Sequence, residues 1–276
     1  MNRYKIGAPL YILRDHAMND LFGVLEKLAK IGYEGVEFVG LFGRTPDEIK
    51  NKLDSLGLVA IGNHVDTNEF YTNIEKTIDD HKILGCRYIT LGWPDSSIKP
   101  GMLEFDSIIN KYRELCNICH DNGIVPLYHN HNYEFTTNPS LLHVLMDLCK
   151  KERLCLEPDL GWMEYCQIEQ TDYLIKYRKR SPVIHLKDVY AHDFSKIGPE
   201  ISHRDLRNNP ETGYFEFRPT GYGVVNFAKL LPYCLDCNPE WFVADHDHSY
   251  GRDSFYDLKL SYDYIKTLLQ IHKMEV

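Results

Sequence analysis

Short apolar runs alternate with longer amphipathic stretches along the whole chain. A short apolar run bounded by turn residues is typical of a buried strand, whereas apolar residues spaced three and four positions apart indicate a helix. The pattern predicts eight strands, within residues 5–10, 35–40, 58–65, 86–93, 124–130, 154–159, 182–188 and 241–247. It predicts a helix after each of them, within 20–32, 45–57, 73–85, 105–123, 138–151, 169–180, 225–236 and 253–273.

Local signals support the ends of several of these helices. Glycine, the usual residue just past a helix C-terminus, closes four of the stretches. Thr45 and Pro46 combine a capping hydroxyl with a proline suited to the first helical position. The four glycines are Gly32, Gly57, Gly85 and Gly123.

Strands that alternate with helices imply a parallel sheet with helical crossovers. Eight such units in 276 residues predict a single α/β domain over residues 1–276, a (β/α)8 TIM barrel. The alternative is an open doubly wound sheet, which usually carries a glycine-rich phosphate loop after its first strand. Residues 9–19, PLYILRDHAMN, contain no glycine, so the barrel is favoured.

Composition narrows the choice of partners. The net charge of −9 disfavours a nucleic-acid binder, which needs a basic face. No run approaches the roughly 18 apolar residues of a membrane span, and the N-terminus lacks the features of a signal peptide. We therefore expect a cytoplasmic protein with no nucleic-acid or membrane partner, and a homo-oligomer is possible.

The eight cysteines include two CxxC pairs, at 116–119 and 234–237. Such pairs can form zinc knuckles or redox sites, but these two lie far apart in the chain and within helical stretches. We expect buried, inert thiols.

Polar residues gather where the predicted strands end. Barrel active sites lie at the carboxyl ends of the strands, and buried unpaired charges are costly, so this concentration indicates function. Carboxylates with one imidazole suit a divalent cation. The candidate ligands are Glu134, Asp159, His185 and Asp245, with Glu157 as a spare carboxylate that faces the same side as Asp159. Taken singly, each has a plainer explanation as a helix cap or a hydrogen-bonded core residue.

Four short motifs carry a resemblance to a known family. They are YHNHNYEF (128–135), DLGW (159–162), HLKD (185–188) and GYG (221–223). With these motifs the chain resembles the sugar phosphate isomerase/epimerase superfamily, the xylose isomerase-like TIM barrels, over essentially its whole length. In that family a Glu, an Asp, a His and a second Glu hold the metal. The first three correspond to Glu134, Asp159 and His185, whereas the fourth falls on Asp245, so the chain has a shorter carboxylate there.

The resemblance implies an isomerase or epimerase of carbohydrate metabolism that uses one divalent metal ion (Mn, Zn, Co or Mg). Such an ion stabilises the enediolate formed when a proton leaves the carbon next to a carbonyl. Glu134 and Asp245 would be the acid/base pair, with Asp247 or His246 as substitutes. Loss of a hydroxyl instead would make the protein a dehydratase of keto-inositols or keto-sugars. The partner would be a small carbohydrate.

A further set of residues near the strand ends would bind the substrate or orient the ligands. For each, a purely structural role such as packing, an ion pair or a surface loop is the alternative. The set comprises His64, His129, His131, Trp162, Lys187, Asp247 and His248.

Two other classes of protein remain open at this point. A three-zinc nuclease of the endonuclease IV type shares the barrel, but it would need a basic face for DNA. A non-catalytic sugar-binding barrel would be consistent with the Asp at position 245.

Overall fold

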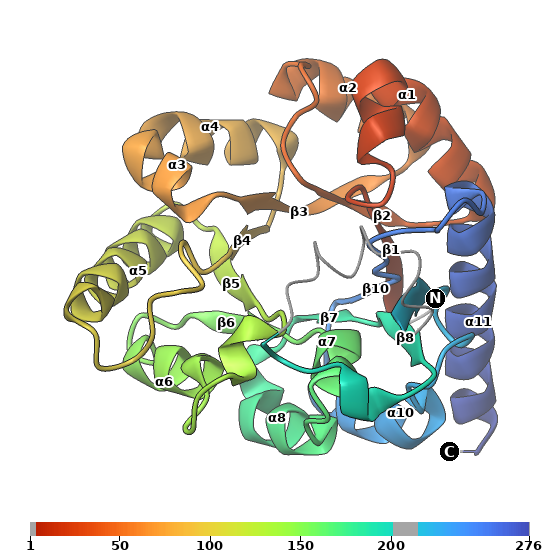
Figure 1. The fold of residues 1–276 in the computed structure, drawn as a ribbon. Coiled ribbons are helices and arrows are strands. Elements are labelled where there is room, and N and C mark those ends of the chain that lie inside the picture. The colour runs from red at the N-terminus through yellow and green to blue at the C-terminus, as the bar shows by residue number, and fades with distance from the viewer. Residues whose placement is uncertain (1–3, 201–214, 276) are drawn as a thin grey trace.

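The computed structural model describes residues 4–200 and 215–275. Its main sheet has eight strands, and every one lies within a range that the apolar pattern predicts (Figure 1). They are β1 (Lys5–Pro9), β2 (Gly35–Phe38), β3 (Val59–Val65), β4 (Tyr88–Leu91), β5 (Val125–His129), β6 (Cys155–Glu157), β7 (Val183–His185) and β10 (Trp241–Val243).

The sheet closes on itself. All neighbouring strands are parallel, and the order is β6-β5-β4-β3-β2-β1-β10-β7. Just past the end of β6, a parallel bridge between Asp159 and His185 joins it to β7, and the His185 N–H donates to Pro158 O at 3.0 Å. The predicted (β/α)8 barrel is therefore confirmed, and two of the predicted metal ligands lie at its seam.

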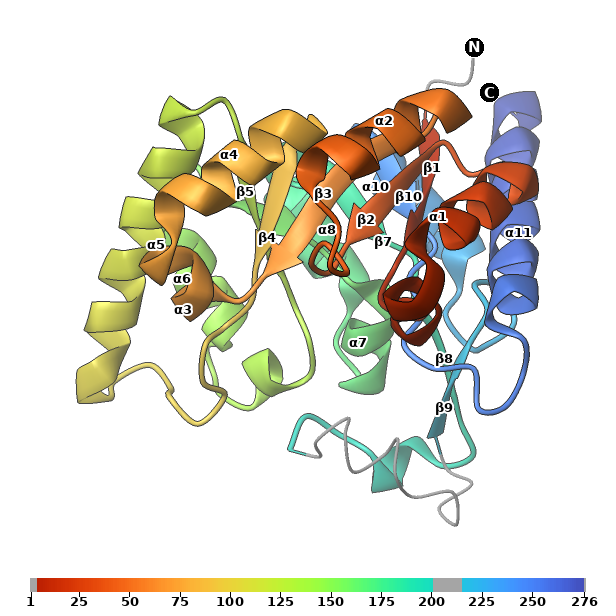
Figure 2. The same ribbon diagram turned by 90° about the horizontal axis from the view of Figure 1, so that it is seen from above.

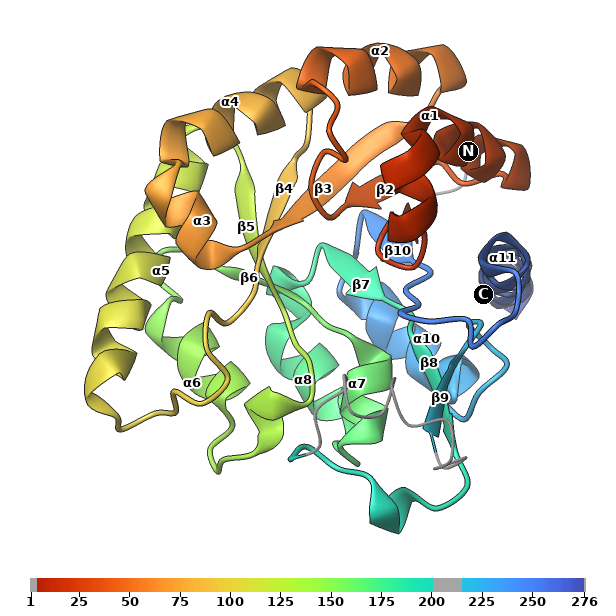
Figure 3. The same ribbon diagram turned by 45° about the horizontal axis from the view of Figure 1, so that its top comes forward.

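Helices surround the barrel on all sides (Figure 3). Thr45 forms a complete capping box with Glu48 at the start of α2, and Gly57 adopts the left-handed conformation that ends it. The eight expected helices are α1 (Arg14–Ile31), α2 (Pro46–Leu56), α4 (Ile74–Leu84), α5 (Leu103–Asp121), α6 (Leu141–Leu148), α8 (Gln170–Tyr177), α10 (Phe227–Asp236) and α11 (Ser254–Glu275).

Several short elements were not predicted from the sequence. They include α3 (Thr67–Thr72), α7 (Leu160–Tyr165) and an antiparallel pair, β8 (Asp188–Ala191) with β9 (Phe215–Arg218). Figure 2 shows α7, β8 and β9 on the side of the barrel away from the N-terminus. Short 3-10 turns occur at η1 (Tyr133–Phe135), η2 (Arg178–Arg180) and η3 (Phe194–Lys196).

An apolar plug fills the lower part of the barrel interior. Trp241 is its largest member, and it packs against Gly35, where an added Cβ would lie 2.7 Å from the indole ring. Glycine at this position thus makes room for the ring. The plug consists of Ile61, Tyr88, Leu127, Val183, Trp241 and Val243.

All eight cysteines are free, and all but the half-buried Cys155 are buried. Burial raises the pKa of Cys119 to about 12, so this thiol is unreactive at neutral pH. The prediction of buried thiols is confirmed. In the part of the chain that the structure describes, no helix combines the length and apolarity that crossing a membrane requires.

Candidate metal and active site

The site is built from the strand residues that lie one pleat above the apolar plug. Side chains two positions apart in a strand point to the same face, so the inward residue that follows each plug residue faces the barrel mouth. Leu127 is followed in this way by His129, Val183 by His185, and Val243 by Asp245. The change from apolar to polar residues between the two layers therefore creates the site.

A cavity of about 380 Å³ opens at this end of the barrel. Its walls contain most of the residues that the sequence singled out. Those residues are His64, His129, His131, His185, Lys187, Asp245 and Asp247.

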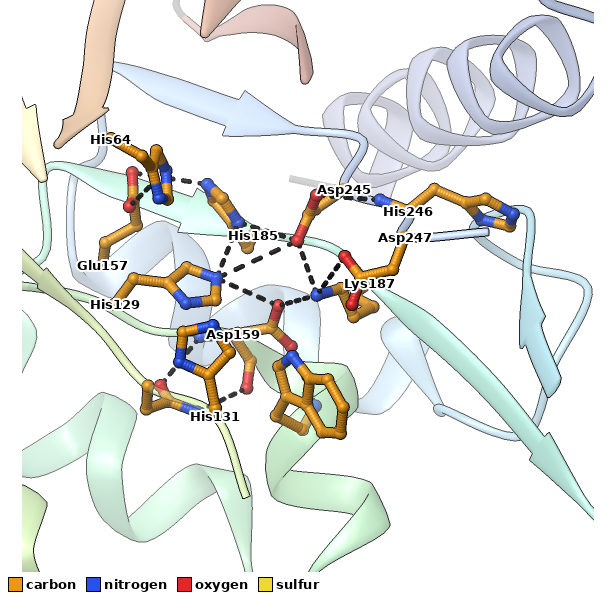
Figure 4. Close-up of polar contacts among 12 residues, drawn as sticks. His64, His129, His131, Glu157, Asp159, His185, Lys187, Asp245, His246 and Asp247 are labelled. Atoms are coloured by element: carbon orange, nitrogen blue, oxygen red, sulfur yellow. Dashed lines mark hydrogen bonds and ion pairs between the residues drawn. The ribbon is translucent and has the colours of Figure 1, made fainter. Parts of the chain in front are cut away.

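Four buried residues form a first group of potential metal ligands, which we call the aspartate group: His129, Asp159, His185 and Asp245. Their ligand atoms all lie within 4.8 Å of one another (Figure 4). His129 Nε2 is 3.2 Å from Asp159 Oδ2, and His185 Nδ1 is 3.1 Å from Asp245 Oδ2. Three of the four predicted ligands are thus brought together, with His129 as the fourth member.

A second group lies on the other side of the His185 ring, and we call it the glutamate group: Glu37, His64, Glu157 and His185. His185 Nε2 is 2.9 Å from Glu37 Oε2 and 3.3 Å from Glu157 Oε1. His64 Nε2 is 3.0 Å from Glu37 Oε2. His185 therefore presents one ring nitrogen to each group.

Lys187 neutralises the aspartate group. Its Nζ lies 2.8 Å from Asp245 Oδ2, 3.0 Å from Asp159 Oδ2 and 3.0 Å from Asp247 Oδ1. The pKa of Lys187 lies well above its ordinary value. Burial opposes this shift, but the three carboxylates outweigh burial. Lys187 is therefore a charged ammonium in the wall of the cavity.

The histidines differ in their charge. The pKa of His185 lies well above its ordinary value. Burial opposes this shift, but the negative charges of Glu157, Glu37 and Asp245 outweigh burial. Burial likewise opposes a charge on His64, whereas Glu37 and Glu157 raise its pKa to about 10. For His129, burial and the neighbouring His185 lower the pKa well below its ordinary value. In the protein alone, His64 and His185 carry the positive charge that faces the carboxylates.

The two aspartates of the aspartate group differ in pKa. Burial raises the pKa of Asp159 to about 6, because the opposing charge of Lys187 does not fully offset it and Asp245 adds to it. Burial acts on Asp245 as well, but Lys187 and His185 hold its pKa well below the ordinary value. The direct contact with His185 Nδ1 gives Asp245 the more stable negative charge.

The donor atoms fit a divalent ion. Buried polar groups are normally hydrogen-bonded, yet several buried atoms here form no hydrogen bond of normal geometry with the described residues, and some of them have only ion-pair contacts. Nitrogen and carboxylate oxygen ligands in this mixture suit Zn²⁺ or Mn²⁺, and an ion would supply the positive charge that the proton on His185 supplies in its absence. The buried atoms are Glu37 Oε1, His64 Nε2, His129 Nδ1, Glu157 Oε1, Asp159 Oδ2 and His185 Nε2.

Comparison with known families places the fold and this site in context. Residues 25–246 match the family described as the xylose isomerase-like TIM barrel. The chain belongs to this family. The match runs from within α1 to the residue after Asp245, so it includes both groups of candidate ligands.

Individual relatives of this xylose isomerase-like barrel are distant but cover nearly all of it. An inosose dehydratase from Geobacillus kaustophilus is 22% identical over 93% of this chain and 89% of its own. A sugar phosphate isomerase/epimerase structure from Parabacteroides distasonis has a TM-score of 0.72 at 19% identity, over 95% of this chain and 93% of the other. The structure of a protein named IOLI with a bound zinc atom has a TM-score of 0.74 at 12% identity, over 96% and 98%. At these identities the structures show the fold alone.

The structure places Glu134 outside both groups. After His129 the chain turns into η1, which directs the Glu134 carboxylate back toward its own strand. Glu134 Oε1 accepts the Tyr128 hydroxyl at 2.6 Å, and Oε2 accepts the His131 N–H at 2.9 Å. Glu134 thus contacts the 128–134 segment, and His129 rather than Glu134 lies among the candidate ligands. The role of Glu134 as a ligand and acid/base stays a prediction.

Among the described residues that line the cavity, neither Trp162 nor His248 appears. Trp162 is fully buried, with its ring 5.1 Å from the Lys187 ammonium, and it packs edge-on against Phe217. His248 Nδ1 accepts the N–H of Tyr250 at 2.8 Å. Trp162 thus packs beside Lys187, and His248 makes a contact within the loop after β10.

Sequence reasoning gave no role to Glu37 or Thr90. Glu37 belongs to the glutamate group, and Thr90 Oγ1 donates to Glu157 Oε2 at 3.1 Å. The signal was the two-residue period, because Glu37 lies two positions after Gly35, which packs against the plug, and Thr90 lies two positions after Tyr88, which belongs to it.

Proposed function

We propose that this barrel is a divalent-metal-dependent enzyme that moves a proton at the carbon next to the carbonyl of a sugar or keto-inositol. The observation that carries the proposal is the convergence of His129, Asp159, His185 and Asp245 within 4.8 Å at the mouth of the cavity. Membership of the xylose isomerase-like family supports it, as does the similarity to an inosose dehydratase.

The aspartate group would hold the ion. An ion bound there supplies Lewis acidity, which lowers the cost of removing a proton next to a carbonyl. The donor set differs from the Glu-Asp-His-Glu set that the sequence suggested, because an imidazole replaces one carboxylate and Asp245 replaces the other Glu. The zinc atom in the IOLI structure supports a metal in this type of barrel.

Asp245 and Asp247 are the proposed proton-transfer groups. Both face the cavity, and both contact the protonated Nζ of Lys187, which lies between the two carboxylates. A carboxylate that shares a charged donor in this way can accept a proton while its neighbour is positioned to return one. Lys187 would also donate a hydrogen bond to a substrate oxygen that gains negative charge.

The fate of the proton decides the reaction. Its return to the same carbon gives epimerisation, and its return to the neighbouring carbon gives isomerisation. Loss of a hydroxyl from the neighbouring carbon, with a proton delivered to the leaving oxygen by Lys187 or Asp247, gives dehydration. The inosose dehydratase relative favours dehydration as the second candidate.

Exchange of solvent deuterium at the carbon next to the carbonyl tests this proposal, because all three reactions begin with loss of that proton. Ketoses, aldoses and keto-inositols would be incubated in D₂O with Mn²⁺-loaded protein and followed by proton NMR. We expect exchange with at least one compound, reduced 100-fold or more in Asp245→Asn and unchanged in Asp236→Asn, an exposed aspartate at the end of α10. Equal exchange rates in wild type and Asp245→Asn, or no exchange with any compound, would contradict the proposal.

A further inference from the structure

The glutamate group has no part in the proposed proton transfer, yet it has the composition of a metal site. Glu37 comes from β2, His64 from β3, and Glu157 from β6, and they meet at the second nitrogen of His185 on β7. Figure 4 shows His64 and Glu157 on the opposite side of His185 from Asp245 and Lys187. Residues from four strands thus converge on one point.

The carboxylates of this group are buried without enough donors. Glu37 is 2% exposed and Glu157 is fully buried. Among the described residues, Glu37 Oε1 and Glu157 Oε1 find no hydrogen-bond donor of normal geometry, although an unsatisfied buried carboxylate oxygen costs several kcal/mol by the usual order of magnitude. Such atoms in a converging cluster point to a ligand that satisfies these oxygens and replaces the protons on the two imidazoles.

No permanent cation balances these carboxylates among the residues that the structure describes. The ion pairs of Glu37 and Glu157 are all with His64 and His185. Lys187 directs its ammonium to the aspartate group instead. Among the described residues, two carboxylates and two imidazoles therefore face one another with no lysine or arginine between them.

The group is also open to solvent. Glu37, His64 and His185 line the cavity, and the His64 side chain is 27% exposed. An ion could enter by this route, and a coordination position would remain for water or a substrate oxygen, as in catalytic metal sites with three protein ligands.

We infer that Glu37, His64 and Glu157 bind a second divalent cation, next to the ion of the aspartate group and with the His185 ring between the two. Glu37 and Glu157 supply the oxygen ligands, and His64 supplies the nitrogen ligand. His185 faces this cation with Nε2 and the other with Nδ1. The second cation would extend the surface available to the hydroxyls of a polyhydroxylated substrate.

Metal stoichiometry after equilibrium dialysis against Mn²⁺, measured by mass spectrometry, tests this inference without relying on catalysis. The variants are His64→Asn, which removes a ligand of the glutamate group, and Asp245→Asn, which removes one from the aspartate group. His143→Asn is the control, because His143 stacks on Tyr173 outside both groups. We expect about two Mn²⁺ per chain in wild type and His143→Asn, and about one in each of the other two variants.

The two proposals can fail separately in this experiment. One Mn²⁺ per chain that is lost in His64→Asn and kept in Asp245→Asn supports the glutamate site and removes the basis of the proposed function. One Mn²⁺ that is kept in His64→Asn overturns the inference, whatever happens in Asp245→Asn. Absence of bound metal in wild type overturns both. Circular dichroism of each variant would show that it is folded, and Glu157→Gln replaces His64→Asn if the latter is not.

Discussion

His185 has the central place in the site because its imidazole has a nitrogen for each group of carboxylates. Sequence reasoning could select it as a candidate ligand, as well as Asp159 and Asp245, because each lies at the end of a predicted strand. It did not foresee that Glu134 lies outside both groups, because the turn after His129 cannot be read from residue spacing. His129 was assigned to substrate binding, although it follows the same two-residue period as His185.

Substitution of Lys187 tests how the buried charges are balanced. Lys187→Met keeps the apolar stem but removes the ammonium that contacts Asp159, Asp245 and Asp247. We expect the free energy of unfolding of the metal-free protein to fall by about 3–5 kcal/mol, as for other broken buried ion pairs. Urea denaturation would measure the loss, and Mn²⁺ should restore part of it.

The control for this substitution is Lys229→Met, which breaks an exposed ion pair with Glu169. Its effect should stay below about 1 kcal/mol and should not depend on Mn²⁺. Similar losses in the two variants would mean that Lys187 does not balance the site.

Substitution of Glu134 tests its supporting role. Glu134→Gln keeps the size of the side chain but places an amide group against the Tyr128 hydroxyl and the His131 N–H, which both donate to the carboxylate. We expect a loss of about 1–3 kcal/mol in the free energy of unfolding and an unchanged metal content. A fall in bound metal, measured by mass spectrometry on folded protein, would instead identify Glu134 as a ligand.

At the scale of elements, the hydrophobic pattern was sufficient for the long helices and all eight barrel strands, because each must bury one face or both. It was insufficient for α3, α7 and the β8–β9 pair, which are too short to display a period. Capping and side-chain contacts determine them instead. Asp159, for example, accepts the N–H of Trp162 at 2.8 Å and so begins α7 while it also belongs to the aspartate group.

Asp188 holds the segment after β9 in place. Its carboxylate accepts the backbone N–H groups of Val189, Gly221, Gly223 and Val225. Asp188→Asn would turn an amide toward two of these donors, so we expect a loss of about 2–3 kcal/mol in the free energy of unfolding. Hydrogen exchange at 221–225 should accelerate. Unchanged exchange there would show that other contacts order the segment.

At the scale of the whole molecule, the barrel is divided into an apolar plug and a polar layer above it. The plug stabilises the closed sheet, and this support permits a dense set of buried charges at the mouth. Sequence analysis could predict the barrel but not which residues of different strands meet inside it. It therefore could not foresee that two clusters of candidate ligands share His185.

Gly35→Ala tests how closely the plug is packed. The added Cβ would lie 2.7 Å from Trp241 and 2.9 Å from Ile61, so the neighbours must shift. We expect a loss of about 1–3 kcal/mol in the free energy of unfolding, as for other overpacked cores. Gly92→Ala, which meets nothing within 4 Å, is the control. Equal effects of the two substitutions would show that the plug has room to adjust.

The proposed function requires that the residues around His185 hold a divalent cation, and the metal content of purified protein measures this. Wild type, His185→Ala and His143→Ala would be prepared without a metal-affinity tag, incubated with Mn²⁺, dialysed and analysed by mass spectrometry. His143 stacks on Tyr173, outside both groups, and serves as the control. We expect at least one metal ion per chain in wild type and His143→Ala, and a lower metal content in folded His185→Ala. Metal-free wild type, or equal metal content in folded His185→Ala, would contradict this expectation.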